Sequence, residues 1–489
     1  MSVSSLPGPF GMGTMGAGAR KWVDTVADMG FSAWQILPLC PVGWGNSPYG
    51  SDGAFAGNTL YIDPEDMERR GMISRHDAEA CVYEGSPYTA DYDFARRTRA
   101  GLVDAAFTAA GLAAENETER FLSQNEQVAR YALFCAVKEK HGGAPWWEWP
   151  EREALPGDID ALAEENRRGM LRFGFAQMLF FRQWAELKRY AADKKIEIIG
   201  DLPFYVSPDS SDVWANRRLF RYEKDLVTPS CVAGVPPDYF SADGQLWGNP
   251  LYAWDTAHEE VTDWWVGRMK AAGQLYDTVR IDHFRAIASY WEIPYGARTA
   301  REGGWRPGPG APLVERIYKS CPELSLIAED LGEYGPEVTE LLEKTGLGGM
   351  RIIQFGFAPG ANSTHLPHNY PRNAAAYVGT HDNNTLLGWL WEASEEERGF
   401  ALDYCSFSGG DWSAGGYGAP ACRAITETVW RSSAYLAVIP FQDMCGFGRD
   451  ARMNIPGVPE GNWRFRTTDQ TIAGIDREYY KKINGVFCR

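Results

Sequence analysis

The sequence has no pair of cysteines spaced as CxxC, although nine cysteines are scattered through its 489 residues. The common structural zinc sites need such pairs, and single scattered cysteines do not suggest a disulfide framework. Reduced thiols in a cytoplasmic protein are the simplest interpretation. No HExxH motif is present and the seven histidines are dispersed. We therefore expect neither a metal site nor a cofactor.

Long apolar runs and positive charge are also scarce. No stretch of about 18 uninterrupted apolar residues predicts a transmembrane helix. The first 18 residues are rich in Gly and Pro and lack the basic start and apolar run of a secretory signal. Lys and Arg number 48 against 65 Asp and Glu, a formal net charge of −17. Because nucleic acids and anionic membranes favour basic surfaces, neither is an expected partner, whereas a neutral substrate fits.

Aromatic residues are abundant, at 13% of the chain with 19 Trp. The apolar faces of sugar rings pack on aromatic planes, so this composition suits a carbohydrate-binding protein. A large aromatic core explains any single Trp equally well. The hydrophobic fraction of 44% and the charged fraction of 23% are ordinary for a folded protein with a sizeable core.

Short apolar runs alternate with helical patterns along the chain. Near-continuous apolar runs are typical of parallel strands covered on both faces. Apolar residues at helical spacing occupy 175–193 and, less regularly, 261–275. Strands that alternate with helices predict a parallel α/β architecture. The predicted strands are 31–39, 196–206, 278–287, 324–331, 350–357, 375–382 and 433–443.

Acidic residues recur where these runs end, at Asp201, Asp282, Glu329–Asp330 and Asp382. The carboxyl ends of parallel strands are where a (β/α)₈ barrel carries its catalytic groups. A single such residue is more readily explained as the N-cap of the following helix. Four of them on separate strands favour the catalytic interpretation, so the sequence predicts a TIM barrel.

Two long stretches interrupt the alternation of predicted strands and helices. Residues from 63 to about 174 are polar and largely helical in pattern, and residues from 207 to about 258 are rich in Pro, Gly, Asp and aromatics. We expect one catalytic barrel domain over 1–489, with a helical insertion at 63–174 and an active-site loop insertion at 207–258. The second insertion should lie over the ends of the barrel strands.

Glycosyl transfer requires two carboxyl groups around one bond, one to attack or stabilise the anomeric carbon and one to donate a proton. Arg280 lies two positions before Asp282, on the same face of a strand, and a nearby cation keeps a carboxylate ionised. A structural salt bridge is the alternative for this pair. Glu329 and Asp330 should point to opposite faces, so only one can face the barrel mouth.

Eleven motifs in order give the sequence a strong resemblance to the amylomaltases and plant disproportionating enzymes, glycoside hydrolase family 77 of the α-amylase clan. No single motif would be specific, but their number and order are. They are 5–9 (SLPGP), 34–39 (WQILPL), 47–49 (SPY), 54–58 (AFAGN), 200–206 (GDLPFYV), 234–241 with 244–250, 280–285 (RIDHFR), 328–332 (AEDLG), 380–383 (THDN), 451–457 (ARMNIPG) and 461–464 (GNWR).

The resemblance implies a role for each matching residue. Asp282 corresponds to the nucleophile, Glu329 to the general acid/base and Asp382 to the transition-state stabiliser. It implies retaining double displacement, in which the 4-hydroxyl of a second glucan replaces water. The residues implied to bind substrate are Arg280, His381, Ser47, Tyr49, Asp238, Tyr239, Trp247, Asn249, Phe355 and Asn454.

The activity implied is that of a 4-α-glucanotransferase acting on α-1,4-glucans and maltooligosaccharides. A hydrolase of the same clan is one alternative, although it should lack the loop signature at 234–250. A glucan-binding protein without activity is another, although it would not need all three carboxylates. The loop at 234–250, with Tyr239 and Trp247, is a candidate lid that excludes water.

The amino-terminal match is short. Relatives in that family carry an apolar first strand before the Leu-Pro-Gly segment, whereas only residues 1–4 precede Ser5 here. We expect either a stub in place of the first barrel strand or a start farther upstream.

Overall fold

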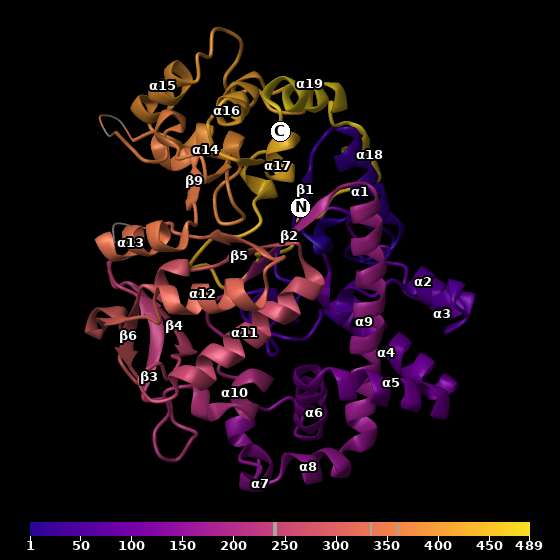
Figure 1. The fold of residues 1–489 in the computed structure, drawn as a ribbon. Helices are drawn as coiled ribbons and strands as arrows, with labels where there is room; N and C mark the ends of the chain where they lie inside the picture. The colour runs from indigo at the N-terminus through magenta and orange to yellow at the C-terminus, as the bar shows by residue number, and fades with distance from the viewer. Residues whose placement is uncertain (238–241, 333–334, 359, 361) are drawn as a thin grey trace.

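Short parallel strands form the centre of the molecule (Figure 1). The computed structural model describes residues 1–237, 242–332, 335–358, 360 and 362–489. One parallel sheet has the order β1-β2-β5-β8 and a second has the order β11-β10-β9. A parallel bridge between Ala328 and Gly349 joins them. The strands are β1 (Ala33–Gln35), β2 (Glu197–Leu202), β5 (Thr278–Ile281), β8 (Ser325–Ala328), β9 (Met350–Ile352), β10 (Ala375–Tyr377) and β11 (Leu436–Val438).

This arrangement is the predicted TIM barrel, in which strands that follow one another along the chain are neighbours. Seven of its strands lie among the described residues, and each falls within a predicted apolar run. The observed strands are shorter than predicted because the apolar run continues into a turn. After β11, for example, the chain turns directly into helix α17 (Phe441–Met444).

The residues before β1 do not form a strand. Val3–Ser5 is a turn of 3₁₀ helix, and the α-amino group of Met1 donates to the carbonyl oxygen of Gln35 over 3.2 Å. Trp34 Nε1 donates to the carbonyl of Met1 over 2.7 Å, so the amino-terminal residue contacts both Trp34 and Gln35 of β1.

Amphipathic helices cover the outside of the barrel. In α9 the buried side chains include Leu171, Phe175, Met178 and Leu187, and Trp184 Nε1 donates to the carbonyl of Leu275 at the end of α11. The helix begins before the predicted 175 because its first turns pack on α6. The covering helices are α1 (Ala17–Asp28), α9 (Arg167–Asp193), α11 (His258–Leu275), α12 (Ala311–Ser320), α13 (Pro336–Thr345), α16 (Pro420–Trp430) and α19 (Arg477–Phe487).

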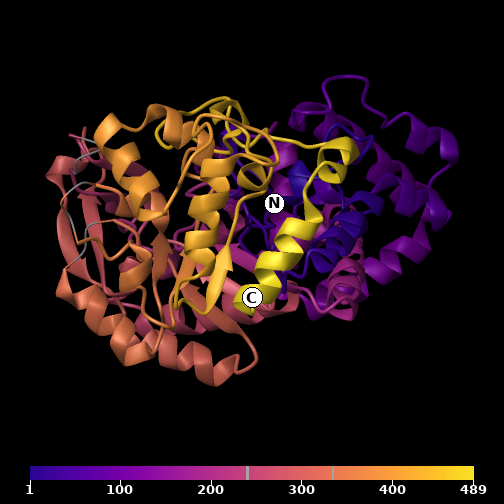
Figure 2. The same cartoon turned by 90° about the horizontal axis from the view of Figure 1, so that it is seen from above.

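A helical region lies to one side of the barrel, as the purple ribbon in Figures 1 and 2 shows. Asp63 and Asp91 cap α2 and α4 by accepting hydrogen bonds from backbone N–H groups three residues on. The helices are α2 (Pro64–Arg69), α3 (Arg75–Glu79), α4 (Tyr92–Ala110), α5 (Leu112–Gln124), α6 (Glu126–Lys140), α7 (Glu151–Ala154) and α8 (Ile159–Glu165). They fall in the stretch predicted to be helical, and its standing as an insertion stays a prediction.

An antiparallel sheet of order β4-β3-β6-β7 lies on the opposite side of the barrel (Figure 2). Strands β3 (Cys231–Val235) and β4 (Gln245–Pro250) follow the short helix α10 (Ser211–Ala215) and come from the predicted loop-rich stretch. Strands β6 (Ser289–Pro294) and β7 (Gly304–Pro307) come from the chain after β5. The apolar pattern did not predict β4 and β7 because several of their side chains are exposed.

Helices α14 (Leu386–Glu392), α15 (Glu395–Tyr404) and α18 (Asp469–Ala473) complete the carboxyl-terminal part, at the top of Figure 1. In the part of the chain that the structure describes, no helix combines the length and apolar character needed to span a bilayer. The barrel interior has its own small core, formed by Ile199, Ile327, Met350, Ile352, Ala375 and Tyr377.

Candidate active site

Asp282 and Glu329 emerge side by side from neighbouring strands. Ile281 and Ala328 are register partners in β5 and β8, and the two acidic residues follow them directly. The ladder continues one step farther, since Glu329 N donates to the carbonyl of Ile281 over 3.1 Å. Asp282 N likewise donates to the carbonyl of Leu202 at the end of β2, over 3.0 Å. Both side chains therefore start at the carboxyl ends of the strands, as predicted for a barrel active site.

Arg280 is shared between two carboxylates. Its Nη1 lies 2.7 Å from both carboxylate oxygens of Asp201 and 2.9 Å from Oδ1 of Asp282. The Asp201 side chain is 1% exposed and the Asp282 side chain is 28% exposed. The predicted contact between Arg280 and Asp282 is thus present as a salt bridge. Asp201 is the buried counter-ion, which leaves Asp282 open to a ligand.

Glu329 is held by two backbone donors. His283 N donates to Oε2 over 2.7 Å and Leu331 N donates to Oε1 over 2.8 Å. Asp330 points the other way, where it accepts from Met350 N over 2.6 Å and lies 3.1 Å from Nη1 of Arg351. The alternation predicted for this acidic pair is confirmed: Glu329 faces Asp282 and Asp330 ties β8 to β9.

Burial raises the pKa of both Asp282 and Glu329 to about 7, and the Arg280 guanidinium opposes the shift in each. The negative charge of one carboxylate also disfavours ionisation of the other. Near neutral pH the pair therefore holds about one proton. The salt bridge with Arg280 favours the ionised form of Asp282, and the two backbone N–H donors favour the ionised form of Glu329.

Asp382 lies in the turn that follows β10 and is anchored by its neighbours. Asn454 Nδ2 donates to Oδ1 over 2.6 Å, and His381 Nε2 lies 3.3 Å from Oδ2. Arg452 donates through Nη2 to the main-chain carbonyl of Asp382 over 2.6 Å and through Nε to that of Asn454 over 2.7 Å. Arg452 was missed as a site residue, although it belongs to the 451–457 motif.

Aromatic rings line the space between Asp201 and Asp382. Tyr49 stacks on His381 with ring centroids 5.1 Å apart, and its hydroxyl donates to Oδ2 of Asp201 over 2.7 Å. Trp463 lies 5.7 Å from the Tyr49 ring and 5.6 Å from the His381 ring. The predicted Tyr49 and His381 are thus brought together, whereas Trp463 was not singled out within its motif.

Trp247 reaches the site from β4 of the antiparallel sheet. Its ring lies edge-on to His283 at a centroid distance of 4.9 Å, and its side chain is 38% exposed. His283, the residue after Asp282, has the left-handed backbone φ of 51°. Burial lowers its pKa to about 3, so the ring is neutral. Trp247 therefore covers the turn after Asp282 while keeping a surface open to a ligand.

Three of the residues predicted to bind sugar form contacts with other residues of the protein. Ser47 Oγ accepts from Tyr49 N over 3.2 Å, and Asn249 Nδ2 donates to the carbonyl of Val206 over 2.8 Å. Phe355 is 45% exposed and packs edge-on against His365. The other two predicted residues, Asp238 and Tyr239, lie outside the described residues.

Comparison with known proteins identifies close relatives. A family model described as 4-alpha-glucanotransferase matches residues 1–471. The chain is 41% identical to the 4-alpha-glucanotransferase of Thermus thermophilus over 485 residues, which cover 95% of this chain and 93% of the relative. It is 36% identical to the chloroplastic 4-alpha-glucanotransferase of Arabidopsis thaliana over 479 residues, with 96% and 81% covered.

Solved structures agree with this similarity. The amylomaltase from Streptococcus agalactiae in complex with acarbose superposes with a TM-score of 0.94 at 35% identity, covering 100% of this chain and 98% of that one. The amylomaltase from Corynebacterium glutamicum has a TM-score of 0.80 at 18% identity, with 99% and 74% covered, which shows a shared fold.

Proposed function

This chain belongs to the 4-alpha-glucanotransferase family, and from that premise we propose that Asp282, Glu329 and Asp382 transfer α-1,4-glucan segments by retaining double displacement. Its substrates are glucans, as for the rest of the family. We assign α-1,4-glucans and maltooligosaccharides as both donors and acceptors. Because the acarbose in the Streptococcus agalactiae complex is an oligosaccharide-like ligand of a close structural relative, it supports this choice.

In the first half-reaction, Glu329 gives its proton to the glycosidic oxygen while an oxygen of Asp282 attacks the anomeric carbon. The bond from that carbon to the leaving oxygen breaks, and the departing glucan carries the proton as its 4-hydroxyl group. Asp282 is left bonded to the remaining glucan segment. Asp382, fixed by Asn454, offers its exposed carboxylate to the hydroxyls of the reacting ring.

In the second half-reaction, Glu329 is ionised and accepts the proton of an incoming 4-hydroxyl group. That oxygen attacks the anomeric carbon and displaces Asp282, which restores both carboxyl groups. Because inversion occurs twice, the new bond has the α configuration of the old one.

One observation carries the proposal: Asp282 and Glu329 follow paired positions of adjacent parallel strands. Such strands lie about 4.8 Å apart. The carboxyl groups of retaining glycosidases are about 5–5.5 Å apart, while inverting enzymes need about 6.5–9.5 Å to admit a water molecule. The spacing of the strands therefore favours direct attack by Asp282.

Transfer requires the acceptor sugar to compete with bulk water. Positioning a bound reactant can be worth an effective molarity of about 10⁵ M or more. Trp247, which covers the turn after Asp282 at the edge of the site, is suited to exclude water there while the acceptor is bound. We assign Trp247 the role of a lid residue.

We also place the enzyme in the cytoplasm. This compartment is consistent with maltooligosaccharide substrates and with reduced cysteines.

Incubation with maltotriose tests the proposal. We expect a ladder of longer oligosaccharides together with free glucose, seen by thin-layer or anion-exchange chromatography. Production of glucose and maltose alone would identify a hydrolase of the same clan instead. Unchanged maltotriose, with binding still measurable by calorimetry, would identify a glucan-binding protein.

A further inference from the structure

Two tryptophans lie side by side on the antiparallel sheet. Trp291 in β6 and Trp305 in β7 are register partners, so their side chains leave the same face of the sheet. Their ring centroids are 5.1 Å apart with an interplanar angle of 72°, an edge-to-face arrangement. Strand β7 forms one edge of this sheet, so the Trp305 side chain stands at its margin. We call Trp291 and Trp305 the tryptophan pair.

Arg285 covers one face of the Trp305 ring. Its guanidinium carbon lies 3.9 Å from the ring centroid, which is a stacked cation–π contact, and its side chain is only 9% exposed. The guanidinium is itself held, because Nη2 donates to Ser289 Oγ over 3.5 Å and lies 3.9 Å from Oε1 of Glu337. The indole of Trp305 therefore rests on a fixed, largely buried support.

The other face of Trp305 is open to solvent. The residue is 43% exposed, although Arg285 lies against one face and Trp291 contacts the ring. Trp291 is half-buried and is fixed by Nε1, which donates to the carbonyl of Ala300 over 2.8 Å. Scattered exposed apolar side chains are normal on a protein surface. A flat ring that is held in place and open on one face differs from them, because a ligand can stack on it without ordering a mobile side chain.

Polar groups stand next to the tryptophan pair. A 3₁₀ turn at Ala300–Glu302 leads directly into β7, and Nε of Arg301 in this turn lies 2.9 Å from Oδ1 of Asp243. Both side chains are more than half exposed, so they can exchange hydrogen bonds with a ligand. A glucose unit presents an apolar ring face and a rim of hydroxyl groups. This combination matches an open indole bordered by charged side chains.

Arg285 also connects the tryptophan pair with the turn after Asp282. It lies three positions after Asp282, in the 3₁₀ helix Phe284–Ile287. Burial and, to a smaller extent, the positive charge of Arg285 lower the pKa of His283 to about 3, so the guanidinium is close to the residue that follows Asp282. A ligand stacked on Trp305 is thus separated from this turn by one side chain.

We propose that the tryptophan pair is a second glucan-binding site, in which one glucose unit of an α-1,4-glucan chain stacks on the open face of Trp305. The proposal rests on the proposed function in one respect, since it takes a glucan as the ligand. A chain bound there stays near the catalytic groups while its other end enters and leaves the cleft, which raises its effective concentration at the cleft. The enzyme should therefore act more efficiently on long glucans than on maltotriose.

Binding can be measured apart from the reaction by native electrophoresis through gels that contain glycogen. The chain with Asp282→Asn serves as the reference, so that the polymer is not consumed. We expect Trp305→Ala in this background to raise the apparent Kd for glycogen by roughly threefold or more, because the stacking surface is lost. Trp305→Phe keeps an aromatic face and should bind more tightly than Trp305→Ala. Trp147→Ala removes a comparably exposed tryptophan from the helical region and should match the reference.

A footprint of the unaltered chain tests the same surface without a substitution at Trp305. Hydroxyl-radical oxidation, read by peptide mapping, should modify Trp305 and Trp147 in the free protein because both are exposed. Maltoheptaose should slow the oxidation of Trp305 and leave that of Trp147 unchanged. This measurement stays decisive even where a substitution at Trp305 disturbs Arg285 and the turn after Asp282.

An equal Kd for glycogen in the reference and in Trp305→Ala, or an unprotected Trp305 in the footprint, would overturn the proposal. An equal rise in Kd with Trp147→Ala would also overturn it, because binding would not then depend on this surface. Self-association that is lost with Trp305→Ala, without a change in Kd, would identify a contact between two copies of the chain instead. A parent that elongates maltotriose but shows no effect of Trp305 rejects only this site, whereas a Kd that depends on Trp305 in a chain that does not elongate maltotriose rejects only the transfer reaction.

Discussion

The backbone N–H of His283 donates a 2.7 Å hydrogen bond to Oε2 of Glu329. Because His283 directly follows Asp282, one peptide unit fixes the position of the Glu329 carboxyl group relative to Asp282. The left-handed φ of 51° at His283 is unfavourable for a residue with a side chain, at a cost of order 1–3 kcal/mol. The backbone conformation of this turn therefore lowers stability, and the turn fixes the distance between the two carboxyl groups.

The two carboxylates should respond differently to a substrate that needs no proton. With maltotriose, Asp282→Asn and Glu329→Gln should each lower the transfer rate by about 10³-fold or more. With α-glucosyl fluoride, whose leaving group needs no acid, Glu329→Gln should still release fluoride quickly while Asp282→Asn stays inactive. Fluoride release measured with an ion-selective electrode checks this. The exposed Asp411→Asn should behave as the parent, and equal loss in both active-site variants on the fluoride would contradict the assigned roles.

The rate of transfer should have a bell-shaped pH dependence. Asp282 must be ionised and Glu329 protonated, and burial raises the pKa of each to about 7. As pH rises through about 7 Glu329 loses its proton and kcat/KM should fall, and at lower pH protonation of Asp282 lowers it again.

Asp201→Asn separates the two limbs of this profile. The negative charge of Asp201 raises the pKa of Asp282. Its removal should therefore move the acidic limb to lower pH while the alkaline limb moves less. Initial rates on maltotriose across the pH range give both limbs, and a uniform loss of rate without a shift would show that Asp201 only supports the fold.

Arg452 should act as a positioning residue for Asp382. Its guanidinium bonds the main-chain carbonyls of Asp382 and Asn454 with two different nitrogens, a fork that lysine cannot reproduce. We expect Arg452→Lys to lower kcat by about 10–100-fold with little change in KM, because a small displacement of a catalytic group is costly. Arg449→Lys, an exposed change nearby, is the matched control. A larger effect on KM than on kcat would contradict this role.

Trp247 should control the partition between transfer and hydrolysis. Removal of its ring opens the turn at His283 to water, so Trp247→Ala should raise the share of maltotriose that is hydrolysed. Trp247→Phe keeps an aromatic cover and should stay close to the parent. The ratio of reducing ends gained to sugars transferred measures the effect, and an unchanged ratio in Trp247→Ala would end the lid hypothesis.

Much of the barrel and its chemistry could be predicted from the sequence. The apolar runs located the parallel strands, and the relatives confirm the predicted family, fold class and activity. Strand lengths were overestimated because the residues after each strand, such as Phe284 and Ile287, are buried in turns and are as apolar as the strand itself. Strands β4 and β7 of the antiparallel sheet escaped prediction because Leu246 and Trp305 are exposed and break the expected pattern.

Only part of the site could be predicted from the sequence. Asp282, Glu329 and Asp382 could be located because they lie at the ends of predicted strands, but their roles stay predictions until variants are measured. Arg452 contacts Asp382, and Trp463 contacts Tyr49 and His381, all of which lie 70 or more positions away in the chain. No local sequence pattern predicts such contacts. At the amino terminus, Val3–Ser5 is a 3₁₀ turn and does not pair along β1.

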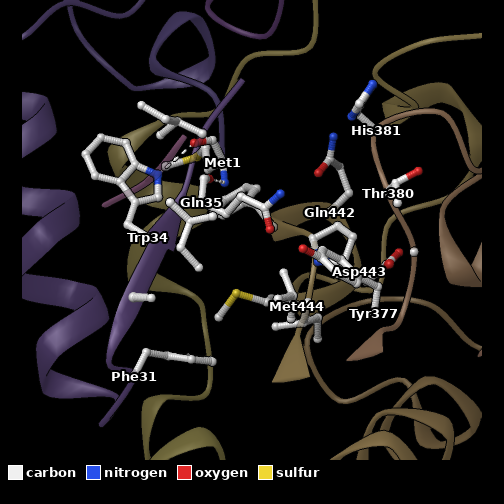
Figure 3. A pocket seen from close by; sticks show the side chains of 18 of the residues that line it. Met1, Phe31, Trp34, Gln35, Tyr377, Thr380, His381, Gln442, Asp443 and Met444 are labelled. Carbon is white, nitrogen blue, oxygen red and sulfur yellow. Dashed lines mark hydrogen bonds between the residues drawn. The ribbon is translucent and has the colours of Figure 1, made fainter. Parts of the chain in front are cut away.

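The buried amino group of Met1 has a consequence for chemical labelling. Amine-reactive reagents modify exposed lysines readily, but in the folded protein the α-amino group lies inside the barrel wall, bonded to Gln35. It should therefore resist acylation under native conditions and become reactive only when Met1 moves away from β1 (Figure 3). The extent of modification at Met1 then becomes a direct readout of how often this contact with β1 breaks.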